Sequence, residues 1–300
     1  MEWRLDAVSG SATRQSAVVM ATLLVGAAVW GLVWYPYRAL EIAGFSSTAS
    51  TVISYAISLL LGVSLFGPRA AELTRHWRAA LAIAITAGWT NLAYVLAMVD
   101  GEVMRVLLLF YLAPLWTVGF ARVLLGERLT RSSALLVLLS LAGALVMLWP
   151  AQGWPLPANA AEWIGLSAGV SFALLNVLSL GAEVLTVEAK STAIWLGVLL
   201  VSAFWLGFGG GVWAMPTSLV LADWLVLVLL GVVMFAISLI IQYGVARVPA
   251  NTAIVVFLVE LVAGAISSAL LSDEVLTARE WLGGAMIVSA SLVAAVRARS

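Results

Sequence analysis

The chain has 300 residues, of which 63% are hydrophobic and 10% are charged, and its mean hydropathy is +1.09. A soluble domain is about half apolar and about a quarter charged, so this composition excludes a soluble globular protein. The 15 basic and 15 acidic residues cancel and predict no nucleic-acid partner, while the lack of cysteine and the single histidine exclude disulfides, thiolate nucleophiles and soft-metal sites.

Ten apolar stretches follow one another along the chain. A helix needs about 20 apolar residues to cross the hydrocarbon core, because each residue rises about 1.5 Å. The polar segment 1–16 precedes a run that is too long for a signal peptide, so we expect a retained first helix. In chain order the predicted spans are 17–39, 46–66, 79–98, 102–125, 132–149, 161–183, 191–213, 221–245, 250–271 and 281–296.

The two halves of the chain repeat each other. Residues 107–130 read LLLFYLAPLWTVGFARVLLGERLT, and residues 254–277 read IVVFLVELVAGAISSALLSDEVLT, at an offset of 147. Phe110 matches Phe257, and the polar match of Glu127 with Glu274 argues against chance similarity of two apolar runs. An odd number of helices per repeat inverts the second copy in the membrane. The fold class predicted is therefore an all-α integral membrane protein with ten transmembrane helices, built as two inverted five-helix repeats over 17–149 and 161–296.

The basic residues predict the orientation. Lys and Arg are enriched in cytoplasmic loops of membrane proteins. With the amino terminus inside, twelve basic residues fall on the inner side and three on the outer side, so both termini are expected in the cytoplasm. The inner set is Arg4, Arg14, Arg69, Arg75, Arg78, Arg122, Arg128, Arg131, Lys190, Arg247, Arg297 and Arg299, and the outer set is Arg38, Arg105 and Arg279.

These features resemble the drug/metabolite transporter superfamily, and within it the EamA-type ten-helix transporters. The resemblance rests on the helix count, the duplication, Pro114 in the fourth helix and the sequence LGERLT at 125–130. It implies alternating access, a central cavity lined mainly by helices 1, 3, 4, 6, 8 and 9, and export of amino acids or related metabolites across a bacterial inner membrane. The second half departs from the pattern, since Leu261 stands where a proline is common and Glu260 lies beside it.

Glu260 is the most informative single residue, because it lies near the middle of the ninth apolar stretch. An ionised carboxylate there costs at least about 2.5 to 3.5 kcal/mol, so it must be protonated, paired or exposed to a wet cavity. The functional interpretation is proton coupling or binding of a substrate amine. The alternative is a structural carboxylate satisfied by neighbouring polar groups.

Further polar and aromatic side chains inside the helices form the predicted substrate-binding set. Trp30 and Trp34 are spaced to share one helix face, although such a stripe also suits packing. Arg105 could act in the cavity or extend to the outer headgroups. Pro114 marks a hinge, a cavity wall or a static kink. The predicted substrate-binding or coupling residues are Glu260, Trp30, Trp34, Asn91, Tyr94, Arg105, Tyr111, Asn176 and Gln242.

The sequence favours a transporter over an enzyme. A polytopic membrane enzyme generally needs clustered His, Asp, Glu, Cys or Ser near one interface, and a channel or sensor needs a pore-like ring of charges or an added domain. Neither pattern is present, so the expected partners are a small-molecule substrate and the lipid bilayer, without cofactor or metal. Deep Lys or Arg clusters for phosphate are also lacking, and an amino acid is the favoured substrate. Monomer and homodimer are equally compatible with the sequence.

Overall fold

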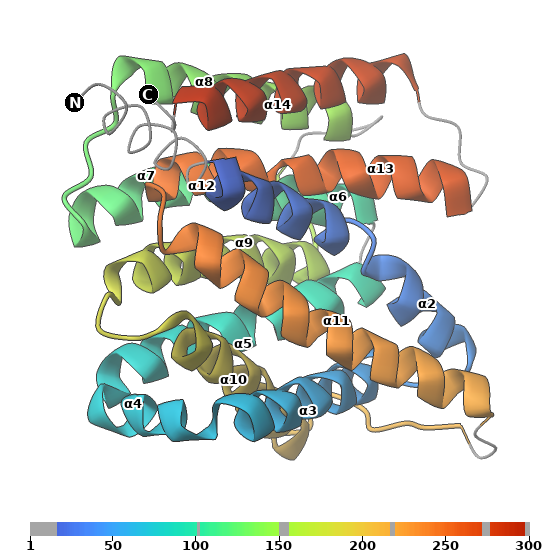
Figure 1. The fold of residues 1–300 in the computed structure, drawn as a ribbon. Helices are drawn as coiled ribbons and strands as arrows, with labels where there is room; N and C mark the ends of the chain where they lie inside the picture. Colours follow the sequence, from blue (N-terminus) through green and yellow to red (C-terminus); the bar gives the residue numbers. More distant parts are fainter. Residues whose placement is uncertain (1–16, 101–102, 150–155, 217–219, 272–276, 298–300) are drawn as a thin grey trace, which may run out of the picture.

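The computed structural model describes residues 17–100, 103–149, 156–216, 220–271 and 277–297, and every element in these ranges is a helix (Figure 1). Nine helices in the described residues are long and apolar enough to cross a membrane. These apolar helices identify an all-α integral membrane protein. Residues Glu274 and Leu276 of the predicted repeat lie outside the described ranges.

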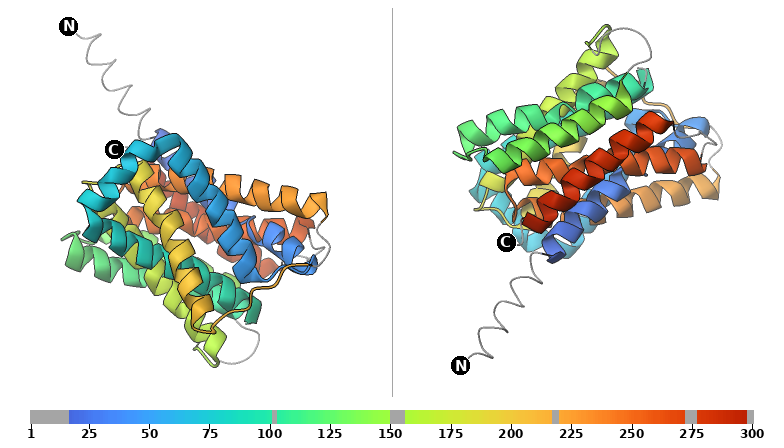
Figure 2. Two further views of the ribbon diagram at one scale, coloured as in Figure 1. Left: turned by 90° about the horizontal axis from the view of Figure 1, so that it is seen from below. Right: turned by 90° about the horizontal axis from the view of Figure 1, so that it is seen from above.

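The observed helices follow the apolar stretches closely. Residues 17–30 are helical, and the further elements, in chain order, are α2 (Trp34–Ile42), α3 (Ser47–Phe66), η1 (Gly67–Arg69), α4 (Ala70–Arg75), α5 (Trp77–Asp100), α6 (Val103–Phe110), α7 (Ala113–Leu124), α8 (Arg131–Leu148), α9 (Ala160–Gly181), α10 (Val187–Gly207), α11 (Leu221–Val245), α12 (Ala250–Phe257), α13 (Val259–Leu271) and α14 (Ala278–Arg297). The nine spanning helices do not include α14, which packs along α8 at one edge of the bundle (Figures 1 and 2).

Three of the predicted spans are interrupted rather than continuous. The first breaks at residues 31–33, the fourth at residues 111–112 between α6 and α7, and the ninth at Leu258 between α12 and α13. Pro114 occupies the first turn of α7, where its missing N–H leaves no helical bond unmade. The ninth span breaks without a proline, so the tertiary surroundings rather than backbone chemistry alone set this break.

The seventh helix ends earlier than expected. Its predicted end was residue 213, whereas α10 ends at Gly207. Gly209 has a φ of 72°, a left-handed conformation that glycine adopts without steric penalty. The N–H groups of Gly209 and Gly210 bond back to Leu206 and Trp205, and these bonds satisfy carbonyls at the helix end. The glycines after Gly207 therefore terminate the helix.

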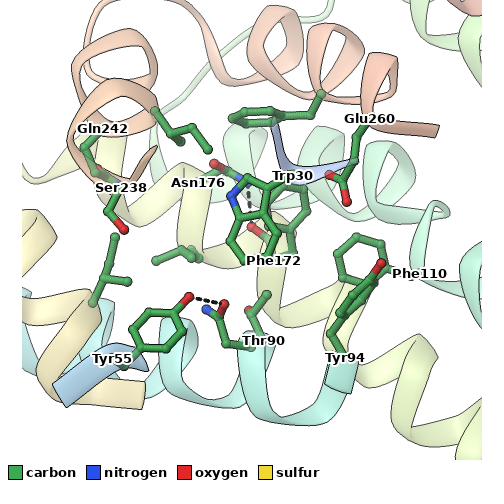
Figure 3. Close-up of a pocket in the computed structure, with 15 residues that line it drawn as sticks. Trp30, Tyr55, Thr90, Tyr94, Phe110, Phe172, Asn176, Ser238, Gln242 and Glu260 are labelled. Atoms are coloured by element: carbon green, nitrogen blue, oxygen red, sulfur yellow. Dashed lines mark hydrogen bonds between the residues drawn. The ribbon is translucent and has the colours of Figure 1, made fainter. Parts of the chain in front are cut away.

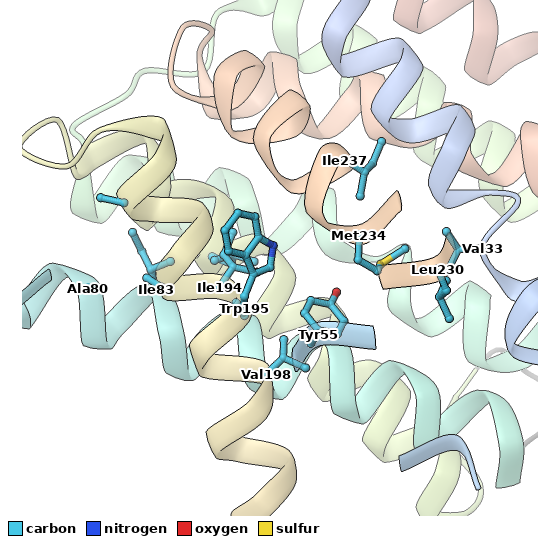
Figure 4. Packing of buried hydrophobic residues seen from close by; sticks show 14 of the residues in the cluster. Val33, Tyr55, Ala80, Ile83, Ile194, Trp195, Val198, Leu230, Met234 and Ile237 are labelled. Atoms are coloured by element: carbon cyan, nitrogen blue, oxygen red, sulfur yellow. The ribbon is translucent and has the colours of Figure 1, made fainter. Parts of the chain in front are cut away.

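Small residues let the central helices approach closely. Packing of this kind, rather than exclusion of water, holds helices together in lipid. The ring of Trp195 on α10 fills the space beside Gly62 on α3, and the backbone of Ala84 on α5 lies against Gly197 on α10. Trp195 is fully buried and lies in one apolar cluster with Tyr55 and Met234 (Figure 4). These contacts bring α3, α5, α10 and α11 into one unit beside α9.

Candidate functional site

A small cavity lies where the interrupted helices meet the continuous ones. Its volume is about 80 Å³. The side chains around it come from the helix at 17–30 and from α3, α5, α6, α9, α10, α11, α12 and α13 (Figure 3). The lining residues are Trp30, Tyr55, Thr90, Asn91, Tyr94, Phe110, Phe172, Leu175, Asn176, Ile194, Ser238, Ile241, Gln242, Phe257 and Glu260.

Glu260 is the one carboxylate among the described lining residues. It lies in the first turn of α13, directly after the break at Leu258. The free N–H groups and the positive end of the helix dipole favour a negative charge there. The hydroxyl of Tyr111 is within hydrogen-bonding range of the Glu260 carboxyl. Tyr111 thus contacts the cavity carboxyl from behind the wall without lining the cavity itself.

Three amide or hydroxyl groups on the wall have defined partners. The hydroxyl of Tyr55 donates to Oδ1 of Asn91 at 2.6 Å, and Nδ2 of Asn91 donates to the carbonyl of Ala87 at 2.8 Å. Nδ2 of Asn176 donates to the carbonyl of Phe172 at 2.8 Å. Both Asn side chains therefore donate an amide proton to a carbonyl on their own helix, and Oδ1 of Asn91 is also occupied by the Tyr55 hydroxyl.

Gln242 differs from the two asparagines, because its Oε1 is buried and has no hydrogen-bond partner in the described residues. An unsatisfied buried carbonyl costs about 1 to 3 kcal/mol. It lies on the same wall of the cavity as Ser238, opposite the side occupied by Glu260 (Figure 3). The group is available to accept a hydrogen bond from a bound solute or water.

Aromatic rings form the rest of the wall. Phe110 stacks on Phe172 with ring centroids 5.4 Å apart, and the ring of Phe257 lies 5.5 Å from that of Phe172 in a tilted arrangement. Tyr94 meets Phe110 edge to face at 5.1 Å. Phe110 and Phe257, which match in the sequence repeat, are the last residues of α6 and α12. Both helix breaks therefore expose an aromatic ring to the same cavity.

Six of the nine predicted site residues line this cavity: Trp30, Asn91, Tyr94, Asn176, Gln242 and Glu260. Trp34 does not, since the break at 31–33 rotates it away and its Nε1 donates to Ser267 Oγ at 2.9 Å. Arg105 lies in the first turn of α6, but its side chain lies outside the part of the chain that the structure describes. Pro114 is buried in the first turn of α7 and is not in the wall.

Sequence reasoning missed the contributions of the second and seventh helices. Tyr55 on α3 and Ile194 on α10 line the cavity, although the family resemblance implied other helices. Tyr55 could have been noticed as a tyrosine near the middle of an apolar span. Phe110 and Phe257 were identified as a repeat match, but that match did not indicate that they face a cavity. Nothing in the local pattern of Ile194 distinguishes it from a packing residue.

A contact between the two halves of the chain lies at the N-terminus of α12. Oε2 of Glu127 accepts a hydrogen bond of 2.6 Å from Nδ2 of Asn251, at the start of α12. The backbone N–H groups of Ala250 and Asn251 also bond to this carboxyl. Burial raises the pKa of Glu127 above its ordinary value of 4.5, and the bonds from Asn251 and Ala250 act against that rise. The contact fixes the loop after α7 to the N-terminus of α12.

Asn251→Ala is expected to destabilise the protein by about 1 to 3 kcal/mol at neutral pH, because a hydrogen bond to a charged group is lost. Thermal unfolding in detergent measures this. Because the pKa of Glu127 is raised by burial, the carboxyl becomes protonated at a less acidic pH than an ordinary glutamate does. A bond to the neutral acid is weaker, so the difference between wild type and variant should shrink in acid.

The matched control is Arg128→Ala, which removes an exposed neighbouring side chain and should shift stability by less than about 0.5 kcal/mol. Equal losses of stability in the two variants would contradict the assigned role of the Glu127 contact. A stability difference between wild type and Asn251→Ala that grows in acid would contradict it as well.

Comparison with known proteins identifies the relationship. Residues 17–149 match the EamA-like transporter family. An uncharacterized transporter from Archaeoglobus fulgidus is 28% identical over 227 residues, covering 74% of this chain and 78% of the relative. A solved crystal structure superposes with a TM-score of 0.73 at 21% identity, covering 95% of this chain and 99% of that one, which shows a shared fold. The first half of the chain is thus similar to the EamA-like transporter family, and most of the chain is similar to a transporter.

Proposed function

We propose that this protein is a secondary transporter that exports small organic metabolites, with amino acids as the favoured class, by alternating access. The observation that carries the proposal is the cavity in which one carboxylate, Glu260, faces aromatic rings and carboxamides. Ligand sites typically have volumes of about 300 to 1,000 Å³. The cavity of about 80 Å³ is smaller, so a substrate enters only after one end of the bundle opens.

The chemistry of the wall supports a zwitterionic or amine-bearing substrate. A substrate ammonium group would pair with Glu260 and lie against the faces of Trp30 or Tyr94, where cation–π attraction contributes. The side-chain N–H groups of Gln242 could donate to a substrate carboxylate, and its free Oε1 could accept from a second donor. Apolar substrate parts would fill the space among the phenylalanine rings.

Alternating access requires two gates, and two contacts between the halves of the chain are the candidates. In one, Glu127 accepts a hydrogen bond from Asn251. In the other, Ser267 receives the bond from Trp34 and donates to the carbonyl of Gly31 at 3.1 Å. We propose that each gate opens in turn while the other holds, with the breaks beside Gly31, near Pro114 and at Leu258 serving as hinges.

The predicted inverted repeat belongs to this proposal. Two observations support it. First, the fourth and ninth spans break after the matching residues Phe110 and Phe257. Second, a twofold axis would exchange α5 with α11 and α10 with α3, and the corresponding pairs both occur, since α5 packs on α10 and α11 packs on α3. Such an axis in the membrane plane would exchange the domains 17–149 and 161–296. Superposition of one half on the other would test it directly.

The proposed orientation places both termini in the cytoplasm of a bacterial cell, with the chain in the inner membrane. The excess of Lys and Arg on the predicted inner side supports this orientation. Val19 near the start of the first helix and Ala294 near the end of α14 belong to one apolar cluster, so both chain ends approach the same face of the bundle. The orientation of the termini would be measured by protease protection of a tag on either terminus, in inside-out and right-side-out vesicles.

Transport by purified protein in vesicles tests the function. Vesicles loaded with labelled amino acids, and in parallel with cationic drugs and organic acids, should release a saturable substrate unchanged, faster when a pH gradient is imposed. Chemical conversion of the solute would instead indicate an enzyme. Unsaturable flux that ignores the gradient would indicate a channel. Either result would overturn the proposal.

A further inference from the structure

A second, larger cavity lies away from the transport site, at the end of the bundle where α9 and α11 finish and α10 begins. Its volume is about 950 Å³. It is bounded by the first helix, the end of α3, the connection from α9 to α10 and the last turns of α11. In Figure 1 these segments meet around the left end of α11. We call it the interfacial groove, because helices that end there end at the membrane surface.

Two cationic side chains in the groove lack carboxylate partners in the described residues. The side chain of Lys190 is 2% exposed, and its Nζ donates to the carbonyl of Ser179 at 2.5 Å. An ammonium group has three donors, so this single acceptor leaves it under-satisfied. Arg247 lies over the ring of Tyr243 at 3.8 Å and donates to that residue's carbonyl at 2.8 Å. Neither contact neutralises a charge.

The other charged groups of the groove do not cancel this pair. Glu188 is bound to Arg69 in an ion pair of 2.6 Å, so both of these charges are already matched. Glu183 is exposed and lies beyond the 4.0 Å ion-pair distance from Lys190, so it acts on Lys190 only as a more distant charge. The two basic groups therefore have no ion-pair partner in the described residues, and they leave a local positive potential that Glu183 offsets only in part. Burial of an ammonium group without an ion-pair partner is costly, and a bound anion would relieve that cost.

The remaining wall of the groove is apolar. Val18 on the first helix and Phe66 on α3 join Leu239 and Ile240 on α11 around the basic pair. A free phosphate ion gains nothing from such a wall, whereas a phospholipid places its phosphate at the interface and its acyl chains beside apolar helices. Basic pockets between helices on the cytoplasmic side are suited to anionic headgroups. The volume also exceeds the needs of an inorganic anion.

We propose that the interfacial groove binds the phosphate headgroup of an anionic phospholipid, with Lys190 and Arg247 contacting the phosphate. The lipid would lie between α11 and the connection from α9 to α10. This site is independent of the transport cavity and of the substrate. Because α11 also forms one wall of the transport cavity, the bound lipid would make the position of the end of α11 depend on the lipid composition of the membrane.

Lipid selectivity tests the proposal. Wild-type protein in phosphatidylcholine vesicles should immobilise trace spin-labelled phosphatidylglycerol in preference to spin-labelled phosphatidylcholine. Loss of one basic side chain, in Lys190→Met or Arg247→Gln, should reduce that preference about fivefold, the size of one contact between a basic residue and an anionic membrane. Arg75→Gln is the control, because Arg75 is an exposed basic residue on α4 outside the groove. It should retain the wild-type preference.

The same measurement separates the other outcomes. Unchanged preference in both groove variants, or an equal loss in the Arg75 variant, would overturn the proposal. Competition by glycerol phosphate or inorganic phosphate as effective as that by phosphatidylglycerol would show a free-phosphate site and would also overturn it. Should Lys190→Met fail to fold, Arg247→Gln decides alone, since Arg247 is exposed and its replacement leaves no buried gap.

Discussion

Replacement of Glu260 by glutamine is expected to abolish the pH dependence of transport and to reduce its rate by about tenfold to a hundredfold, while the protein still folds. Glutamine keeps the shape of the side chain but can neither exchange a proton nor pair with an ammonium group. A charge-assisted hydrogen bond contributes about 1.5 to 3 kcal/mol, and each 1.4 kcal/mol corresponds to about tenfold. The expected effect follows from the position of Glu260 in the cavity wall.

The measurement is initial flux into or out of vesicles across a range of pH, together with the unfolding temperature in detergent. Glu41→Gln is the matched control, because Glu41 is an exposed carboxylate on α2 and does not line the cavity. It should leave both flux and pH profile unchanged. A Glu260→Gln protein with the wild-type rate and pH profile would reduce Glu260 to a structural group capping α13.

Gly169→Ala is expected to destabilise the protein by about 1 to 3 kcal/mol, the usual effect of overpacking. Gly169 lies on α9, and an added Cβ would come within 2.9 Å of the Cα of Phe110 and closer still to the Phe110 carbonyl oxygen. These are backbone atoms, so they cannot rotate away, and α6 would have to move. Because Phe110 also lines the cavity, transport should fall together with stability.

Gly119→Ala on α7 provides the opposite case. Nothing lies within 4 Å of the position that its Cβ would occupy. Alanine favours a helix over glycine by about 1 kcal/mol, so this variant should be slightly more stable. Unfolding temperatures of the two variants should therefore shift in opposite directions. Shifts of the same sign would show that the contact between α9 and the end of α6 is looser than the structure has it.

Several features of the protein could be predicted from the sequence because they depend on each side chain alone and not on its neighbours in the folded structure. The free energy of moving a side chain into lipid depends mainly on that side chain, so hydropathy located the spans to within a few residues, as α11 at 221–245 shows. The same reasoning singled out Glu260, a carboxyl deep in an apolar run. Six of the nine proposed site residues then proved to line one cavity.

Other features depend on neighbours that are distant in the chain, and only the tertiary structure decided them. The break at Leu258 has no local cause such as proline, and it persists because the surrounding helices accommodate the interrupted backbone. The break at 31–33 turned Trp34 toward Ser267, although helical spacing placed it with Trp30. Tyr55 entered the site through its bond to Asn91, 36 residues away. Helical spacing predicts a shared face only for a continuous helix, so it cannot reveal a break that packing imposes partway along a span and that turns the later residues to another side.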